Sequence, residues 1–332
     1  MSKHVVVGAG PVGQATAREL VSQGHEEVLL VSRTGSGSEI EGVARVALDV
    51  TDATALGRLA EGASALYNCI NPPSYDVWTT YWPPIAASFL AAAERSGAVL
   101  ATASCLYAYG PVDEPMVEGM PDAAPGVKGR LRGQMWAEAK QAHDEGRIRA
   151  VEVRGSDYMG VGVTNAHIPI VAAKALSGKS VRVFGSADEP HTFTDVRDMA
   201  RALVTVASTP SAHGRVWHAP SNPPVTQTQA VADVCRAAGR EPGAVRVWPS
   251  AMLSVGGLFM GFLKELRETV YQFQRPYVMD SSAIERELGL APTPWDEVCR
   301  ATAEHAAQAM RSPAAGSTST HTGLRAGGAV EV

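Results

Sequence analysis

The sequence predicts an α/β fold, a doubly wound parallel sheet with a smaller C-terminal substrate lobe. In residues 1–155, short apolar runs alternate with longer runs whose apolar residues recur at helical spacing. Strands that alternate with helices in this way indicate βαβ units, in which the strands lie parallel. After Gly155 the loops lengthen and prolines become frequent, which indicates a lobe added to the sheet.

Each element has its own local signal. Helices are predicted where apolar residues repeat every three to four positions and a glycine follows, as at Gly24 and Gly62. In the third helix, Pro83 and Pro84 are expected near the first turn, where proline is tolerated. The predicted strands are 4–10, 27–33, 44–50, 65–70, 98–104 and 148–155, and the helices are 12–24, 52–62, 81–97, 130–146 and 193–208.

Composition excludes several classes of protein. The net charge of −5 argues against a nucleic-acid surface, which needs clustered excess Lys and Arg. None of the four cysteines has metal-ligand spacing, so we expect no metal and a reduced, cytoplasmic protein. The N-terminus runs straight into a strand, so no signal peptide is expected. The apolar run 252–263 is too short to span a bilayer.

The first strand leads into a glycine motif, "GAGPVG", with Gly8, Gly10 and Gly13 around Pro11 and Val12. Between a strand and a helix, this spacing predicts a dinucleotide site on a Rossmann sheet. Gly8 permits the tight turn, Gly10 lets the backbone approach a pyrophosphate, and Gly13 lets the helix pack closely. The N-terminus of the helix then faces the phosphates.

The end of the second strand predicts which coenzyme binds. An NAD site usually has an acidic residue there, whereas this chain has Ser32, Arg33 and Thr34. Because Arg33 can pair with a 2′-phosphate, we expect NADP rather than NAD. The adenine is expected beside Asp49 and Val50, and the coenzyme ribose beside Asn71 and Pro72.

The predicted domains follow from this site. Residues 1–155 form the dinucleotide-binding domain, and 191–218 return to it. Residues 156–311 form the substrate-binding lobe. The small, polar, Gly-rich segment 312–332 is predicted to be a flexible tail.

With these motifs, the chain resembles the short-chain dehydrogenase/reductase superfamily, and more narrowly its extended NAD(P)-dependent epimerase/dehydratase branch. The resemblance covers roughly residues 3–305 and is carried by "GAGPVG", "LDVTD", "ATASCLYAYGP", "VEVRGSDYMGVGV" and "HTFTDVRDMARAL". It implies a nicotinamide coenzyme and a small-molecule substrate that Tyr158 would contact. Because superfamily members often pair through helices, it also implies a homodimer.

The resemblance fails at the catalytic residues. Such enzymes use a serine and a helical Tyr-x-x-x-Lys, in which tyrosine is the acid or base and lysine holds the nicotinamide ribose. This chain contains no Tyr-x-x-x-Lys. Counting back from Arg154, the arginine at the end of the sixth strand, places Arg132 at the lysine position and Lys128 at the tyrosine position. Cys105 falls where the serine is expected.

The replacements suggest roles. Arg132 can bind ribose hydroxyls but cannot transfer protons, because its pKa stays above ~12. Lys128 would face the substrate, with a pKa below its usual ~10.4, and donate a proton or hold an anion. Both could instead be solvated helix cations. Tyr107 and Tyr109, just past the fifth strand, are candidate acids or else pack the loop. Tyr81 and Trp82 would wall a substrate pocket or form an interface.

Three functions remain open. The first is an NADP-dependent oxidoreductase acting on a small metabolite or biosynthetic intermediate, with the hydride supplied by the coenzyme. The second is a non-redox isomerase, lyase or cyclase on the same fold. The third is a non-enzymatic NADP(H)-binding regulator that meets a partner through the apolar run 252–263. Fold alone does not decide among them.

Overall fold

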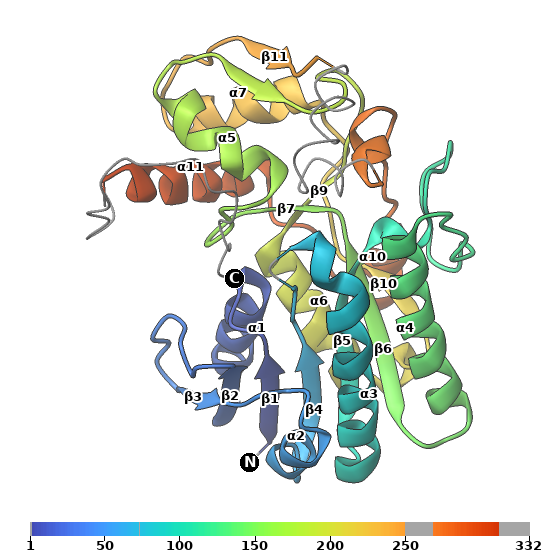
Figure 1. Cartoon of the computed structure of the whole chain (residues 1–332). Coiled ribbons are helices and arrows are strands. Elements are labelled where there is room, and N and C mark those ends of the chain that lie inside the picture. Colours follow the sequence, from blue (N-terminus) through green and yellow to red (C-terminus); the bar gives the residue numbers. More distant parts are fainter. Residues whose placement is uncertain (1, 73, 250–267, 312–332) are drawn as a thin grey trace, which may run out of the picture.

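The computed structural model describes residues 2–72, 74–249 and 268–311 and confirms the predicted doubly wound α/β fold. In this part of the chain, the main sheet has seven parallel strands in the order β10-β6-β5-β4-β1-β2-β3 (Figure 1). The chain order reverses beside β1, so a topological switch point lies there. The strands are β1 Lys3–Val7, β2 Glu27–Ser32, β3 Val43–Ala47, β4 Ala63–Asn68, β5 Val99–Cys105, β6 Arg149–Gly155 and β10 Val216–His218.

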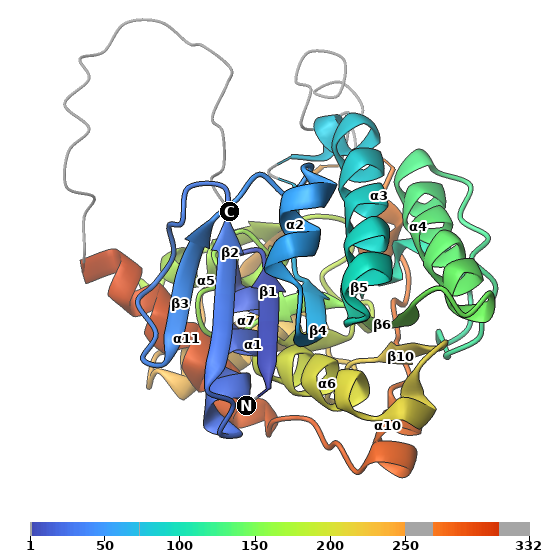
Figure 2. The ribbon, with the colours of Figure 1, turned by 90° about the horizontal axis from the view of Figure 1, so that it is seen from below.

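Helices cover both faces of this sheet, as Figure 2 shows from below. One face carries α1 (Pro11–Ser22) and α6 (Val196–Ser208), which pack on each other. The other face carries α2 (Ala53–Leu59), α3 (Trp78–Ser96) and α4 (Val127–Asp144). Thus α6 and β10, both from 191–218, lie with the sheet of the first domain.

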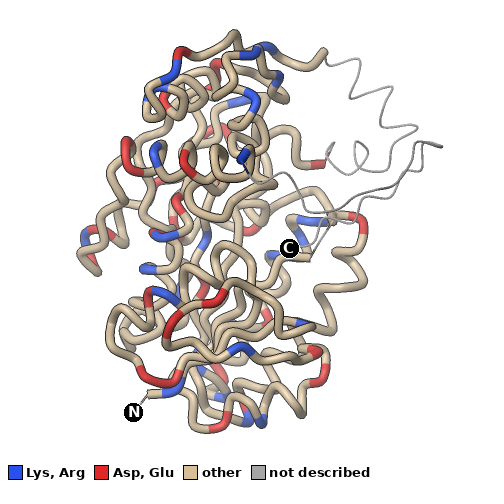
Figure 3. Tube along the Cα trace, turned by 90° about the vertical axis from the view of Figure 1, so that its left-hand side faces the viewer, with Lys and Arg blue, Asp and Glu red and all other residues tan. Residues whose placement is uncertain are grey.

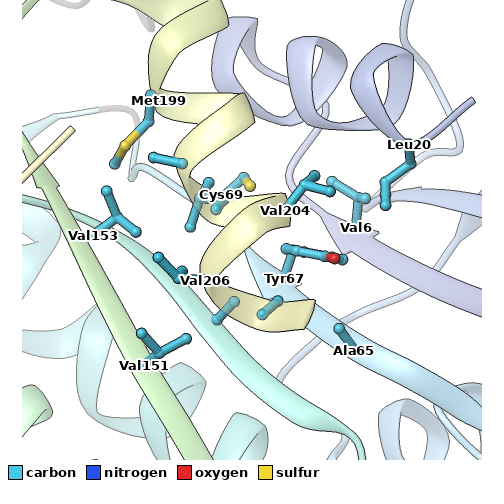
Figure 4. Packing of buried hydrophobic residues seen from close by; sticks show 14 of the residues in the cluster. Val6, Leu20, Ala65, Tyr67, Cys69, Val151, Val153, Met199, Val204 and Val206 are labelled. Atoms are coloured by element: carbon cyan, nitrogen blue, oxygen red, sulfur yellow. The ribbon is translucent and has the colours of Figure 1, made fainter. Parts of the chain in front are cut away.

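The core consists of two apolar layers, one on each side of the sheet. Figure 4 shows the α6 side, where Val204 of α6 lies beside Val6 of β1 and Tyr67 of β4, and Met199 of α6 lies beside Val153 of β6. The strands other than the largely exposed edge strand β3 are buried on both faces, which explains why they appear in the sequence as continuous apolar runs rather than as alternating patterns. Packing on both sides fixes the strand ends, which is where the candidate site is built.

The remaining elements form a lobe above the carboxyl ends of the strands (Figure 1), except α10 (Ser282–Leu288), which packs on β10 beside the main sheet. Its core packs helices α5, α7 and α11 together, beside the short parallel pair β8 and β11. A second parallel pair, β7 and β9, joins the lobe to the sheet. The bounds are β7 Asp157–Met159, α5 His167–Leu176, β8 Val181–Val183, β9 Phe193–Asp195, α7 Gln227–Ala237, β11 Val245–Val247, α10 Ser282–Leu288 and α11 Trp295–Arg311.

The structure differs from the sequence prediction at two helix starts. Helix α3 begins at Trp78 rather than at residue 81, so Pro83 and Pro84 lie inside the helix and not in its first turn. They leave the carbonyls of Thr79 and Thr80 without backbone donors four residues on. Helix α4 begins at Val127, which places Lys128 in its first turn. No helix among the described residues is long and apolar enough to cross a membrane. The segments 252–263 and 312–332 lie outside the described residues.

Candidate functional site

The glycine motif forms a tight cradle between β1 and α1. Gly8 has a φ of +108°, which side chains rarely adopt, and its N–H donates to Val31 O at 2.9 Å. A Cβ on Gly8 would lie 2.5 Å from Cys69 O, and one on Gly13 would lie 1.8 Å from Gly8 O. Gly10 is the N-cap of α1, with Pro11 as the first helical residue and Val12 next to it. Only glycine fits these two contacts, and the helix N-terminus is left facing outward.

Arg33 and its neighbours follow directly at the end of β2. Arg33 and Thr34 are exposed, and the Ser32 hydroxyl donates to Ser36 O at 2.9 Å. Arg33 Nη1 donates to the hydroxyl of Tyr81 at 3.3 Å. The structure therefore places Tyr81, a predicted substrate contact, beside the arginine predicted to bind a 2′-phosphate.

The other predicted coenzyme contacts lie on neighbouring strand ends. Asp49 is exposed and accepts from the Thr51 backbone N–H and hydroxyl, which lower its pKa, and the charge of Arg33 lowers it further. Val50 is buried. After β4, Asn71 is exposed and Pro72 is buried. These positions line the carboxyl edge of the sheet.

Lys128 lies inside the protein, 4% exposed, so it is not a solvated helix cation. Its Nζ lies 3.0 Å from Glu268 Oε2, and its backbone N–H donates to Glu268 Oε1 at 2.5 Å. Glu268 thus caps the N-terminus of α4 and pairs with the lysine in its first turn. The Lys128 Nζ also lies 5.3 Å from the ring centroid of Tyr75.

Arg132 is one turn further along α4 and is equally buried. Its guanidinium carbon lies 4.0 Å from the ring centroid of Trp82 and 4.9 Å from that of Trp78. Within the described chain, its Nε and Nη1 have no hydrogen-bond partner. A buried cation held by two indole rings, with two N–H groups unsatisfied, is suited to bind oxygen atoms of a ligand. The structure places Trp82, another predicted substrate contact, beneath this cation.

Two phenols meet beside these cations. Tyr107 follows β5 in the short helix Leu106–Ala108, and its hydroxyl lies 2.8 Å from that of Tyr75 in the short helix Tyr75–Val77. Burial raises the pKa of Tyr107 well above its usual value. Burial also raises the pKa of Tyr75 to about 12, while the hydrogen bond from Tyr107 and the charge of Arg132 oppose the rise.

Cys105 and Tyr158 complete the cluster. Burial raises the pKa of the Cys105 thiol, and Arg132 opposes that rise more than Arg154 does. Burial likewise raises the pKa of Tyr158, and the charges that act on it include Cys105, Cys69 and Arg132. A Cβ on Gly155 would lie 3.0 Å from the Tyr158 hydroxyl, so Tyr158 packs against the end of β6.

Tyr109 is set apart from the other candidates. Its hydroxyl is 2.8 Å from His218 Nε2, and the guanidinium of Arg154 lies 4.5 Å from its ring centroid. Arg154 itself makes ion pairs with Glu152 and Asp122. Through Arg154 and His218, this buried network connects the segment after β5 to the ends of β6 and β10.

Sequence reasoning missed a carboxylate and histidine pair at the same edge. Asp157 of β7 lies 2.7 Å from His191 Nε2, and His191 Nδ1 lies 3.1 Å from Gln272 O. The Gln272 side chain reaches the Tyr107 hydroxyl at 3.5 Å. The charge of Asp157 raises the pKa of Tyr75 and Tyr107. Asp157 therefore belongs to the cluster formed by these two tyrosines and the cations of α4. Its position two residues past the sixth strand is the one available sequence signal.

A cavity of about 330 Å³ opens beside this cluster. Its lining includes Tyr107, Gly126, Gly129, Glu268 and Tyr271, and no residue of the glycine motif. It therefore adjoins the α4 N-terminus rather than the coenzyme cradle. Figure 3 shows acidic and basic residues interspersed along the described chain, without a basic stripe.

Several solved structures share this fold. The Thermotoga maritima UDP-glucose 4-epimerase with UDP-glucose has 15% identity and a TM-score of 0.74, covering 93% of this chain and 99% of that one. The Bacillus cereus UDP-glucuronic acid 4-epimerase with NAD has 14% identity and a TM-score of 0.76, covering 94% and 99%. The Bacillus anthracis dTDP-glucose 4,6-dehydratase with NAD has 14% identity and a TM-score of 0.75, covering 93% and 97%. At such identities they show the fold alone.

Sequence comparison identifies the family. A search of curated protein sequences found no match. The family model described as the NAD dependent epimerase/dehydratase family matches residues 4–219, which include the glycine motif, both cations of α4 and the Asp157–His191 pair. Because this match spans well over half of the chain, the protein belongs to the NAD-dependent epimerase/dehydratase family.

Proposed function

We propose that the protein is an NADP-dependent oxidoreductase that acts on a small metabolite or biosynthetic intermediate, with Lys128 and Arg132 in place of the Tyr-x-x-x-Lys pair. The observation that carries the proposal is the buried Arg132, whose unsatisfied N–H groups lie on the same sheet edge as the glycine cradle. Retaining an unpaired buried cation costs stability, which indicates that a ligand satisfies it.

The residues present fit a dinucleotide. Gly8 and Gly13 allow a tight strand–turn–helix packing in which a Cβ would collide with backbone atoms, and Gly10 opens the helix whose N-terminus would face the pyrophosphate. Arg132 would hold ribose hydroxyls through Nε and Nη1. The bound nicotinamide would supply or accept the hydride.

Arg33 supports a preference for NADP. Among the described residues, only Nη1 of its guanidinium is hydrogen-bonded, to Tyr81, so the other N–H groups would be available to a 2′-phosphate. The same residues leave no acidic side chain at the end of β2 for a 2′-hydroxyl. Two of the solved structures named above, the Bacillus cereus epimerase and the Bacillus anthracis dehydratase, contain NAD, so this preference would distinguish the chain from them.

Binding measurements test this coenzyme preference. By calorimetry on the purified protein, NADPH should bind at least tenfold more tightly than NADH. Arg33→Ala should remove that difference by weakening NADPH alone, because one charge-assisted hydrogen bond contributes about 1.5–3 kcal/mol. Arg58→Ala, an exposed arginine in the last turn of α2, is the matched control and should change neither affinity. Equal affinities in the wild type would refute the preference, and no binding of either coenzyme would refute the proposed function.

Redox-neutral catalysis is the second candidate, favoured by membership of an epimerase/dehydratase family. The reductase and the redox-neutral enzyme differ in how many NADPH molecules they consume for each product. Incubation with NADPH and a panel of aldehydes, ketones and imines should consume one NADPH per product if the protein is a reductase. Product formation at constant NADPH would instead support the isomerase or lyase.

Light scattering on the same sample tests the homodimer that the family resemblance implies.

A further inference from the structure

The proposed function leaves the proton donor unassigned, because Arg132 cannot donate and Lys128 is paired with Glu268. Tyr75 lies beside both cations. It belongs to the short helix that follows β4, whereas the family's tyrosine would lie on α4. Its ring is 5.1 Å from that of Trp78, which in turn stacks on Arg132. Chain segments far apart in sequence thus bring a phenol and two cations together.

We propose that Tyr75 is the catalytic acid of this site, with its oxygen hydrogen-bonded to Tyr107 and its ring beneath Lys128. This inference rests on the proposed function and assigns the proton donor, while Lys128, at the position of the family's tyrosine on α4, acts through the ring of Tyr75. The contacts that support it are the 2.8 Å hydroxyl pair and the 5.3 Å distance from Lys128 Nζ to the ring centroid. A cation over the ring and a hydroxyl at the oxygen both stabilise the phenolate.

The competing phenols are less suited to this role. The Tyr109 hydroxyl is bound to His218, and the buried Tyr277 hydroxyl has no partner within the described residues. Burial raises the pKa of Tyr107, Tyr158 and Tyr277, as it does that of Tyr75. Among these phenols, Tyr75 alone combines a hydroxyl partner at its oxygen with a cation over its ring.

Hydrogen-bond direction also favours Tyr75. Gln272 Nε2 donates to the Tyr107 oxygen at 3.5 Å, so the Tyr107 proton is available for the Tyr75 oxygen. In that arrangement the Tyr75 proton points away from the pair and is free for a ligand. When Tyr75 loses its proton, the Tyr107 hydroxyl remains in place as a donor to the phenolate.

The proton and electron balance is simple for a carbonyl substrate. Bound NADPH would supply a hydride, which is a proton with two electrons, to the carbonyl carbon. The carbonyl oxygen would receive the proton of Tyr75. The carbonyl is reduced to an alcohol, the coenzyme is oxidised to NADP⁺, and Tyr75 is left as a phenolate. A proton from water then restores the phenol. In the reverse direction the same phenolate accepts the proton of an alcohol.

The test needs no substrate. The oxidised nicotinamide is cationic, and a nearby cation lowers the pKa of a phenol by about 1–3. From about 12, Tyr75 should therefore ionise between about pH 9 and 11 in the NADP⁺ complex. Ultraviolet difference spectra of the NADP⁺ and NADPH complexes, titrated over this range, should show one tyrosinate in the former. The ionisable groups that face Tyr75 are Lys128 and Arg132 of α4, Cys105 and Tyr107 after β5, and Asp157 of β7.

Variants decide the assignment. Tyr75→Phe should abolish the tyrosinate signal, and Tyr107→Phe should keep it but move its midpoint to higher pH. Tyr158→Phe, which removes a different phenol from the same cluster, should leave the signal unchanged. A signal that survives in Tyr75→Phe, or is lost only in Tyr158→Phe, would overturn the proposal, as would its absence from the wild type. Calorimetry on each variant separates these outcomes from a loss of NADP⁺ binding, which would count against the proposed function instead.

Discussion

Replacing Arg132 with methionine should stabilise the coenzyme-free protein while weakening coenzyme binding. The guanidinium is 4% exposed, and its Nε and Nη1 have no partner among the described residues. Each unsatisfied N–H costs ~1–3 kcal/mol, and each of the two indole contacts returns ~0.5–2 kcal/mol. At the middle of these ranges, the two N–H groups cost about 4 kcal/mol and the two ring contacts return about 2.5 kcal/mol. The charge therefore costs about 1–2 kcal/mol net, which methionine would recover while it keeps contact with the rings.

The two effects have separate assays. Urea unfolding without coenzyme should give a free energy of unfolding about 1–2 kcal/mol higher for Arg132→Met than for the wild type. Calorimetry should show NADPH affinity about 10- to 150-fold lower, because one charge-assisted hydrogen bond contributes ~1.5–3 kcal/mol. Arg130→Met, an exposed neighbour on α4, serves as the control for the loss of a helix cation. If Arg132→Met destabilised the free protein and left NADPH affinity unchanged, a purely structural role would be indicated and the reasoning would fail.

Further predictions concern the cradle, the carboxylate and the buried histidines. Gly13→Ala should abolish coenzyme binding and destabilise the fold by about 1–3 kcal/mol, measured by calorimetry and urea unfolding, because its Cβ would lie 1.8 Å from Gly8 O. Asp157→Asn should lower the midpoints of tyrosine ionisation in a spectroscopic titration, since the Asp157 charge raises the pKa of Tyr75 and Tyr107; unchanged midpoints would contradict this. Burial lowers the pKa of His218 from 6.5 to about 4, so its contribution to stability is present above pH 6.5 and is lost as the pH falls through 4. That loss amounts to about 3 kcal/mol, and His218→Asn should flatten the acid limb of the unfolding free energy against pH.

The coenzyme cradle could be predicted from the sequence because its requirements are local. A positive φ at Gly8 and a close approach at Gly13 are properties of a few consecutive residues, and a strand–turn–helix pattern encloses them. The spacing of Lys128 and Arg132 also followed from helix periodicity, although their burial did not. The alternative of two solvated cations is wrong because Trp78 and Trp82 cover Arg132.

The rest of the site depends on long-range packing. Tyr75 meets Tyr107 across 32 positions of sequence, and Asp157 meets His191 across 34. Such pairs arise because the carboxyl ends of β4, β5 and β6 lie side by side in the sheet, an arrangement that no local pattern encodes. To find these residues from the sequence, all polar residues just after each predicted strand would have to be considered, including those outside any known motif.

His191 is anchored by two hydrogen bonds that join separate elements. Its Nε2 lies 2.7 Å from Asp157 Oδ2, and its Nδ1 lies 3.1 Å from the Gln272 carbonyl oxygen. Because a carbonyl oxygen can only accept, the second bond requires a hydrogen on Nδ1. We therefore expect a downfield N–H signal from His191 Nδ1 in proton NMR. Asp157→Asn changes only the partner of the other ring nitrogen, so the Nδ1 signal should persist, and its loss would show that the Gln272 carbonyl does not anchor the ring.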